Sequence, residues 1–189
     1  MEPVSQSELS DDFYERIKPR LHRRIGRELR LAGRILDIGC GSCDLARYLA
    51  ETYCQRVTGV DILSNSFPKR RGHSRRGRVR CIQKDAAHLD FVDDRSVDAV
   101  VMMWALHEMG HPQAILDEAH RVLRPGGEIL IVDFPKGSLA QKLWNEDYYP
   151  PHEVERLLKK AEFEDVKVRL VHQKQVIWAH GYQPPAAGP

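Results

Sequence analysis

Bulky apolar residues recur at every fourth position near the start of the chain, at Phe13, Ile17, Leu21, Ile25 and Leu29. This spacing puts them on one face of a helix, and Arg and Lys fill many of the other positions. The pattern therefore predicts an amphipathic basic helix. Pro19 lies inside it and lacks a backbone N–H, so we expect the helix to kink or restart there.

The rest of the chain alternates short apolar runs with amphipathic segments. The apolar runs are typical of buried strands, and the segments between them have the period of helices. We expect strands at 34–38, 56–61, 78–84, 97–103, 128–134, 165–172 and 175–181, and helices at 43–52, 112–123 and 152–161. Strands alternating with helices predict a parallel sheet covered on both faces, and the closely spaced last two strands predict an antiparallel hairpin.

The segment 62–77 has no helical period and is rich in Ser, Gly, Pro and Arg, so we expect an exposed loop. No acidic residue lies between Ile62 and Lys84, whereas positive charge gathers at Lys69, Arg70, Arg71, Arg75, Arg76, Arg78 and Arg80. Two interpretations stay open. The charges form a solvated surface, or they bind an anionic substrate, RNA or an acidic partner.

The composition sets limits on the class of protein more than on its partners. A chain of 189 residues with 42% hydrophobic residues suits one domain with a full core. No apolar run approaches the roughly 20 residues of a membrane helix, and the first residues lack the apolar core of a signal peptide. We therefore expect a cytoplasmic protein that does not bind membranes. The net charge of +2 favours no class of partner.

The four cysteines, at positions 40, 43, 54 and 81, lie on or beside predicted buried strands and a turn. In a chain of this size and expected location, reduced thiols are favoured over a disulfide framework. Cys40 and Cys43 spell C-x-x-C, but no second such pair and no closely spaced histidine pair accompanies them. We therefore expect no metal site.

Residues 35–44 read Ile-Leu-Asp-Ile-Gly-Cys-Gly-Ser-Cys-Asp, an apolar strand that runs through a glycine turn into a helix. This is the build of a nucleoside-binding loop. A dinucleotide site would have glycine at position 44, where this chain has Asp44. A carboxylate there repels phosphate but suits a ligand with an ammonium and a sulfonium, such as S-adenosylmethionine. A dehydrogenase is therefore the least favoured function.

Five segments follow one another in sequence order, the first of them within this loop: Leu36–Gly41, Val57–Asp61, Lys84–Ala86, Val97–His107 and Arg121–Gly127. Together they resemble the motifs of class I S-adenosylmethionine-dependent methyltransferases, in particular the small-molecule group that includes the ubiquinone and menaquinone biosynthesis enzymes. The resemblance implies an α/β fold: a Rossmann-like three-layer αβα sandwich with a seven-stranded, mostly parallel sheet and an antiparallel last strand. Cys43 departs from the family, which usually has a third small residue there, most often glycine.

The chain divides into three parts on this interpretation. Residues 1–33 are expected to form an N-terminal cap-helix region, as in relatives, and 34–182 the S-adenosylmethionine-binding methyltransferase domain. The end of the chain, 183–189, is rich in Pro, Ala and Gly and is predicted to be a disordered tail.

The resemblance implies that cofactor-binding residues follow the strand ends, at Asp37, Gly39, Cys40, Gly41, Asp44, Asp61, Ile62, Asp85, Ala86, Met102 and Met103. Asp37 is expected to face the methionine amino group. Asp61 is expected to accept bonds from both ribose hydroxyls, with a turn cap as the lesser alternative. Asp85 is expected either to accept from the adenine amino group or to cap a short helix at 86–90, and the two roles compete equally.

His107 follows the fourth predicted strand at the mouth of the expected crevice, so it is the best candidate for a general base or a substrate hydrogen bond. Glu108 beside it completes the predicted catalytic pair. A structural role for His107, bonded to backbone, stays equally open. Further substrate-binding candidates are His111, Tyr14, Trp144, Tyr148 and His152.

Three functions follow from these observations. The first is S-adenosylmethionine-dependent in-line methyl transfer to a small acceptor, anionic or aromatic. The second is a methyltransferase that reaches RNA or protein through the Arg-rich segment 69–80, for which strong salt dependence would be the sign. The third is a non-catalytic regulatory module that binds S-adenosylmethionine. The oligomeric state carries no expectation.

Overall fold

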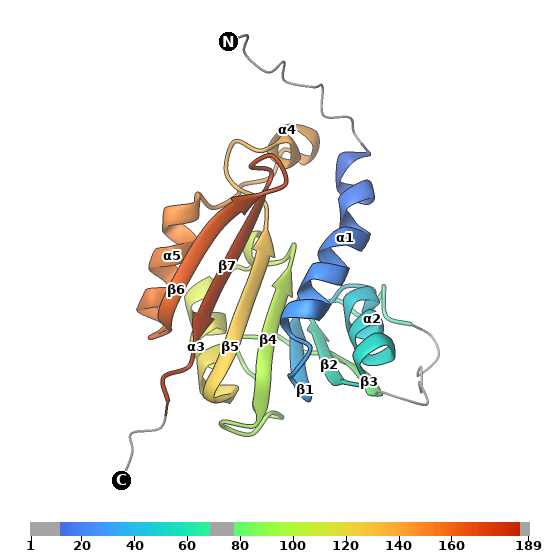
Figure 1. The fold of residues 1–189 in the computed structure, drawn as a ribbon, viewed down its shortest axis with the longest axis vertical. Coiled ribbons are helices and arrows are strands. Elements are labelled where there is room, and N and C mark those ends of the chain that lie inside the picture. Colours follow the sequence, from blue (N-terminus) through green and yellow to red (C-terminus); the bar gives the residue numbers. More distant parts are fainter. Residues whose placement is uncertain (1–11, 69–77, 186–189) are drawn as a thin grey trace.

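One sheet of seven strands, with helices on both faces, is formed by the residues that the computed structural model describes, 12–68 and 78–185 (Figure 1). The strands are β1 (Arg34–Ile38), β2 (Arg56–Asp61), β3 (Arg78–Gln83), β4 (Val97–Met103), β5 (Leu123–Asp133), β6 (Glu164–Val171) and β7 (Val176–Tyr182). Their order is β3-β2-β1-β4-β5-β7-β6. Only β7 pairs in antiparallel fashion, with β5 and β6, among these strands. The predicted α/β fold class and terminal hairpin are confirmed.

The helices are α1 (Phe13–Glu28), α2 (Asp44–Tyr53), α3 (Pro112–Val122), α4 (Leu139–Trp144) and α5 (Pro151–Lys160), with a 3₁₀ turn, η1 (Leu106–Glu108), after β4. Two predictions about local structure were wrong. Residues 86–90 form turns rather than a helix, and α4 lies in a segment for which no helix was expected.

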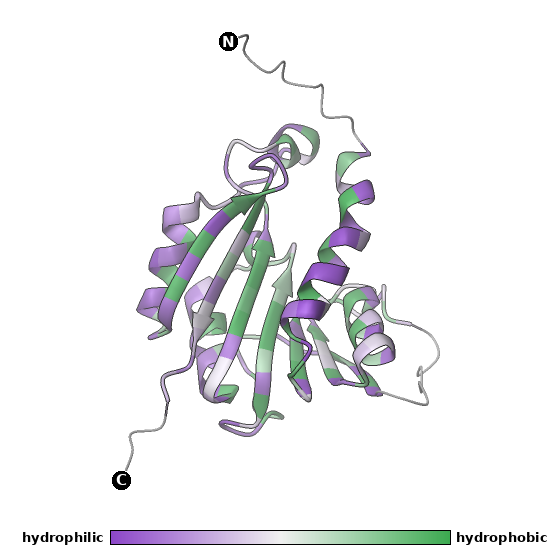
Figure 2. Cartoon of the chain, in the orientation of Figure 1, coloured by the Kyte–Doolittle hydropathy of each residue, from purple (hydrophilic) through white to green (hydrophobic). Residues whose placement is uncertain are grey.

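The side chains of each strand alternate between two apolar cores, one on each face of the sheet. Ile35 packs with α1 and α2 on one face, whereas Leu36 packs with α3 and α5 on the other. Figure 2 shows the central strands as the most hydrophobic part of the molecule. This double burial explains why the parallel strands are nearly continuous apolar runs.

Helix α1 packs its apolar stripe into the same core as α2. Leu21, Ile25 and Leu29 are fully buried, as the four-residue spacing predicted. The helix runs through Pro19 without a break, contrary to the expected kink or restart. Pro19 is exposed, so the backbone carbonyl that lacks its N–H donor can bond to water instead.

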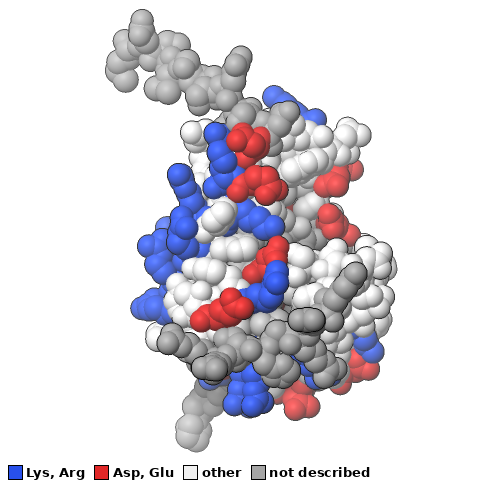
Figure 3. Space-filling model, turned by 90° about the vertical axis from the view of Figure 1, so that its right-hand side faces the viewer, with Lys and Arg blue, Asp and Glu red and all other residues white. Residues whose placement is uncertain are grey.

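The opposite side of α1 is basic and faces outward. Arg20, Arg23 and Arg27 are exposed, and Figure 3, which looks at the molecule from the side of α1 and α2, shows Lys and Arg gathered along one edge. Most of the Arg-rich segment, 69–77, lies outside the described residues, so the prediction of an exposed loop there stays untested.

The end of the described chain is more ordered than expected. Gln183, the first residue of the predicted disordered tail, is 8% exposed and exchanges backbone hydrogen bonds with Gly126 and Gly127. Its side chain donates to the carbonyl of His120. Residues 186–189 lie outside the described part. Within the described residues, no helix has the length and apolar character needed to cross a membrane.

Candidate active site

A cavity of about 370 Å³ opens at the carboxyl ends of β1, β2 and β4. Parallel α/β sheets commonly hold ligands at this edge, and the volume falls within the range of small-molecule sites. Eight of the predicted site residues line the cavity: Gly39, Gly41, Asp61, Ile62, Asp85, Ala86, Glu108 and His111.

The glycine loop after β1 is shaped by close contact and by a left-handed backbone. Gly39 has φ +70°, and a Cβ built on it would collide with the Cβ of Ala105. The N–H of Gly41 donates to Oδ2 of Asp61 at 2.8 Å, which ties the loop to the end of β2. At position 39 only glycine allows both the positive φ and the close approach of Ala105.

Cys43 takes the place of the usual third small residue without closing the cavity. It is fully buried, directly before α2, with φ +58°, a conformation that normally favours glycine. Its sulfur would lie only 3.2 Å from a Cβ built on Gly59 of β2, so the lack of a side chain at Gly59 makes room for Cys43.

The structure pairs Cys43 with Cys81 of β3 as a disulfide, so the prediction of four reduced thiols was wrong for this pair. Cys40 and Cys54 are free, and Cys40 Sγ lies 3.4 Å from Cys43 Sγ. The sheet register brings β3 under the glycine loop, a proximity that sequence spacing does not reveal.

Asp37 lies beneath the glycine loop and is 2% exposed. Its Oδ2 has no hydrogen-bond partner among the described residues. Burial, together with the charge of Asp61, raises the pKa of Asp37 to about 7. An unpaired buried carboxylate oxygen is costly, so this group suits a ligand that brings a positive charge or a donor.

Asp61 and Asp85 end β2 and follow β3, and both make turn contacts as well as lining the cavity. Asp61 Oδ1 accepts from the N–H of Leu63 at 3.0 Å, in addition to its bond with Gly41. Asp85 Oδ1 accepts from the N–H of Ala87 at 2.9 Å, which caps a turn rather than the expected helix. Each carboxylate oxygen has a second lone pair, so these bonds leave room for a ligand.

Five predicted cofactor residues do not line the cavity: Asp37, Cys40, Asp44, Met102 and Met103. Asp44, at the start of α2, bonds instead to Ser42 and Arg47. The backbones of both methionines pair with β5, so the residues that reach the cavity are the next two, Trp104 and Ala105.

His107 is held by Asp133, the last residue of β5. Nδ1 of His107 lies 2.8 Å from Oδ1 of Asp133, and the backbone N–H of His107 donates to Oδ2. Both side chains are 4% exposed. Burial lowers the pKa of His107, but the bond and charge of Asp133, with the charges of Glu108 and Glu146, raise it above the ordinary value. The structural role considered for His107 is present, through a carboxylate rather than a backbone group.

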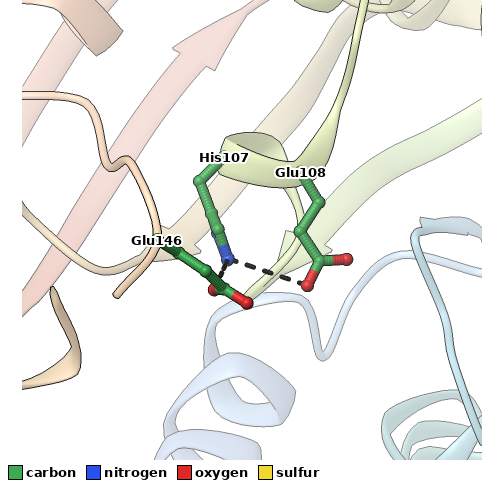
Figure 4. Close-up of side chains that lie close together, drawn as sticks. All are labelled: His107, Glu108 and Glu146. Atoms are coloured by element: carbon green, nitrogen blue, oxygen red, sulfur yellow. Dashed lines mark ion pairs between the residues drawn. The ribbon is translucent and has the colours of Figure 1, made fainter. Parts of the chain in front are cut away.

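Nε2 of His107 points toward two further carboxylates (Figure 4). It lies 3.3 Å from Oε2 of Glu146 and 3.8 Å from Oε1 of Glu108, and we call these three side chains the His107 cluster. The hydroxyl of Tyr148 donates to Oε2 of Glu146 at 2.8 Å. Burial, and then the charges of Glu146, Asp133 and Asp61, raise the pKa of Glu108 despite the opposing charge of His107.

Aromatic rings pack beside the His107 cluster. The ring of Tyr148 lies 4.4 Å from that of His107, and Phe134 contacts Trp104, Trp144 and Tyr148. Tyr14 of α1 joins this group, but it is buried and its hydroxyl accepts from the N–H of Ala140.

The other substrate candidates differ in position. Trp144 is 45% exposed at the end of α4, and His111 lines the cavity. His152 lies exposed on α5 and is not part of the cavity lining.

Four residues of the site were not predicted from the sequence: Trp104, Ala105, Asp133 and Glu146. Asp133 had a usable signal, because it ends a strand as Asp61 does. Glu146 had none, because it lies in an irregular segment whose position depends on packing.

A family model described as "Methyltransferase domain" matches residues 36–131, from β1 into β5. The chain belongs to the methyltransferase domain family. The resemblance to class I S-adenosylmethionine-dependent methyltransferases is thereby confirmed, since the matched segment contains all five strand-end motifs.

Curated methyltransferases are similar over part of this methyltransferase domain. The demethylmenaquinone methyltransferase of Thermus thermophilus is 32% identical over 109 residues, which cover 54% of this chain and 47% of that protein. The fatty-acid O-methyltransferase of Mycolicibacterium smegmatis is 35% identical over 135 residues, which cover 69% of this chain and 47% of that protein. The chain thus spans about half the length of these relatives.

Solved structures share the fold of this methyltransferase domain. A SAM-dependent methyltransferase from Archaeoglobus fulgidus has a TM-score of 0.72 at 18% identity, covering 89% of this chain and 93% of that one. The Burkholderia thailandensis 1,6-didemethyltoxoflavin-N1-methyltransferase, with S-adenosylhomocysteine bound, has a TM-score of 0.65 at 20% identity, covering 94% and 86%. At such identities the likeness shows the fold alone.

Proposed function

We propose that this chain is an S-adenosylmethionine-dependent methyltransferase that acts on a small-molecule acceptor. The cavity carries the proposal, because it joins a tight glycine loop to carboxylates at strand ends. Asp37, with its unpaired buried oxygen, fits the cofactor's amino group. Asp61, in the cavity wall, fits the ribose hydroxyls. Membership of the methyltransferase domain family supports the same reaction.

The adenine end of the cofactor would lie between β2 and β3. Asp85 and the backbone N–H of Ala86 suit the polar edge of adenine, and Ile62 supplies an apolar face. Trp104 and Ala105 replace Met102 and Met103 as the residues expected near the methionine portion, because they follow β4 into the cavity.

When bound, S-adenosylmethionine supplies an electrophilic methyl group on a sulfonium. The protein's main contribution is to orient the acceptor behind that methyl, which can lower the barrier by roughly 7–11 kcal/mol. His107 adds a proton acceptor. Its Nδ1 bonds to Asp133, so Nε2 is the nitrogen available to take the proton of a hydroxyl or N–H acceptor. Glu108, which lines the cavity, helps to position that acceptor.

The character of the acceptor follows from the walls near His107. Trp144 and Tyr148 offer aromatic surface, which favours an aromatic acceptor. Glu108 and Glu146 carry negative charge, which disfavours the anionic acceptor considered from the sequence. The relatives named for demethylmenaquinone and fatty acids support a small molecule rather than RNA or protein.

The decisive experiment is calorimetric titration with S-adenosylmethionine, S-adenosylhomocysteine and NAD, followed by a screen of aromatic hydroxyl and amine acceptors for S-adenosylhomocysteine release. We expect both adenosyl ligands, but not NAD, to bind, and at least one acceptor to be methylated. Absence of adenosyl binding would contradict the cofactor assignment. Binding without turnover on any acceptor would favour the regulatory module.

A further inference from the structure

The His107 cluster combines one imidazole nitrogen with two carboxylates from separate segments of the chain. His107 and Glu108 come from η1 after β4, and Glu146 comes from the segment after α4 (Figure 4). We propose that these three side chains bind a divalent metal ion. The proposal concerns a binding site and does not depend on the proposed methyl transfer.

The spacing of the three ligand atoms is close to that of a metal site. They lie within 4.8 Å of one another, with 3.3 Å between His107 Nε2 and Glu146 Oε2. An ion with bonds of about 2.1 Å holds neighbouring ligands roughly 3.0–3.4 Å apart. The side chain of Glu108 is 68% exposed, so its carboxylate can move the remaining distance.

Two of the three ligands already have the outer partners that metal sites use. Asp133 accepts the N–H of His107 Nδ1, which leaves the Nε2 lone pair for a metal. Tyr148 donates to the carboxylate of Glu146. Carboxylate–histidine–metal arrangements and hydrogen-bonded ligating carboxylates are typical of protein metal sites. Neither Asp133 nor Tyr148 belongs to the cluster, so these contacts are independent of the ligand spacing.

The charge balance also favours a cation. Three carboxylates, those of Glu108, Glu146 and Asp133, surround a single imidazole. A divalent ion would offset this excess of negative charge, whereas an anion would increase it.

The donor set indicates which ions fit. One imidazole nitrogen with two carboxylate oxygens suits Mn²⁺, Fe²⁺, Co²⁺ or Zn²⁺ better than Mg²⁺, which prefers oxygen ligands. Three protein ligands leave coordination positions open. Glu108 also lines the cofactor cavity, so the ion would lie at its edge, where an acceptor oxygen could bind it.

An ion here would use the same lone pair of His107 that we propose as the proton acceptor. The ion and the proton therefore compete, and the ion-bound protein would activate a hydroxyl acceptor by lowering its pKa through coordination. The expectation of no metal site rested on the cysteines and took no account of residues brought together by folding.

The test is titration of the metal-free, tag-free full chain with MnCl₂, followed by electron paramagnetic resonance and calorimetry. Mn²⁺ is the probe because Zn²⁺ would also bind the exposed thiol of Cys54. We expect one Mn²⁺ per chain. Glu146→Gln and Glu108→Gln should each weaken binding at least tenfold, and Tyr148→Phe, which removes an outer partner, about tenfold.

Glu155→Gln is the matched control, because it removes an exposed carboxylate that pairs with Lys159 on α5, and it should leave Mn²⁺ affinity unchanged. Circular dichroism establishes that each variant is folded. Absence of stoichiometric binding to the wild type, or equal affinity in the wild type and both cluster variants, would overturn the proposal. Titration of the same metal-free samples with S-adenosylhomocysteine tests the proposed function separately.

Discussion

The cofactor cavity and the His107 cluster are neighbours, but the chain builds them differently. The polar groups of the cavity lie within a few residues of a strand end, so the register of the parallel sheet alone aligns them. The His107 cluster needs Glu146, which follows α4 and whose position depends on packing against aromatic side chains. The register of the sheet therefore positions the cavity residues, whereas the packing of the loops after β4 and α4 positions the His107 cluster.

Substitution of His107 should separate the two regions most clearly, because it should lower the rate of methylation and leave cofactor affinity unchanged. In His107→Asn, methylation of an acceptor found in the screen should fall about 10²–10⁴-fold, since the group that activates the acceptor is lost. Calorimetric affinity for S-adenosylhomocysteine should stay within about twofold of the wild type. His88→Asn, at an exposed position that does not line the cavity, is the control. Equal losses in both variants would deny His107 a special role.

Asp61→Ala, in contrast, should strongly weaken cofactor binding. The carboxylate holds the N–H of Gly41 and is the proposed ribose ligand, and hydrogen bonds to charged groups contribute about 1.5–3 kcal/mol each. We expect S-adenosylhomocysteine affinity to fall at least about 100-fold in calorimetry. Asp90→Ala removes an exposed surface carboxylate paired with Lys84 and should retain affinity. Intact binding in Asp61→Ala would refute the cofactor assignment.

Gly39→Ala tests whether the glycine loop is as tight as its geometry indicates. The new Cβ would meet Ala105, at a positive φ, so unfolding in urea should show a loss of about 2 kcal/mol. Gly110→Ala is matched, because a Cβ there meets nothing within 4 Å. The loop would be looser than described if the two variants proved equally stable.

The raised pKa of Asp37 predicts that cofactor affinity depends on pH. Burial and the charge of Asp61 raise this pKa to about 7, so below that pH the carboxyl is protonated in the free protein. A cationic amino group binds the ionised form, and the proton must then leave. S-adenosylhomocysteine affinity should therefore fall up to about tenfold per pH unit below 7 and level off above it.

Calorimetry between pH 5.5 and 8 measures this dependence on Asp37, with Asp37→Asn as its control. The variant should bind more weakly above pH 7 but lose the dependence on pH. A slope that persists in Asp37→Asn would assign the proton to another group.

The smallest effect is expected at Tyr14, a predicted substrate residue that the structure buries. Its hydroxyl accepts from the N–H of Ala140, so Tyr14→Phe should lower the free energy of unfolding by about 1 kcal/mol. Affinity for S-adenosylhomocysteine should not change, because Tyr14 does not line the cavity. Tyr182→Phe, at the exposed end of β7, provides the comparison. A change in acceptor specificity without loss of stability would restore the substrate role.

Helix α4 shows why part of the fold escaped prediction. It has six residues, too few for a clear apolar period. The N–H of Leu139 bonds to Gln175, and that of Ala140 to Tyr14, so distant side chains cap its first turn. A helix stabilised in this way cannot be predicted from its local sequence. The apolar stripe of α1 and the apolar runs of β1 and β4, in contrast, predict their elements clearly.

Local sequence patterns determined the alternation of strands and helices, the glycine loop and the carboxylates at strand ends. Each of these depends on residues close together in the chain and on the fixed geometry of a parallel sheet. Tertiary structure alone decided that Asp133 meets His107, that Cys43 meets Cys81, and that Glu146 lies beside His107. These contacts join residues far apart in sequence, and only packing of the whole chain brings them together.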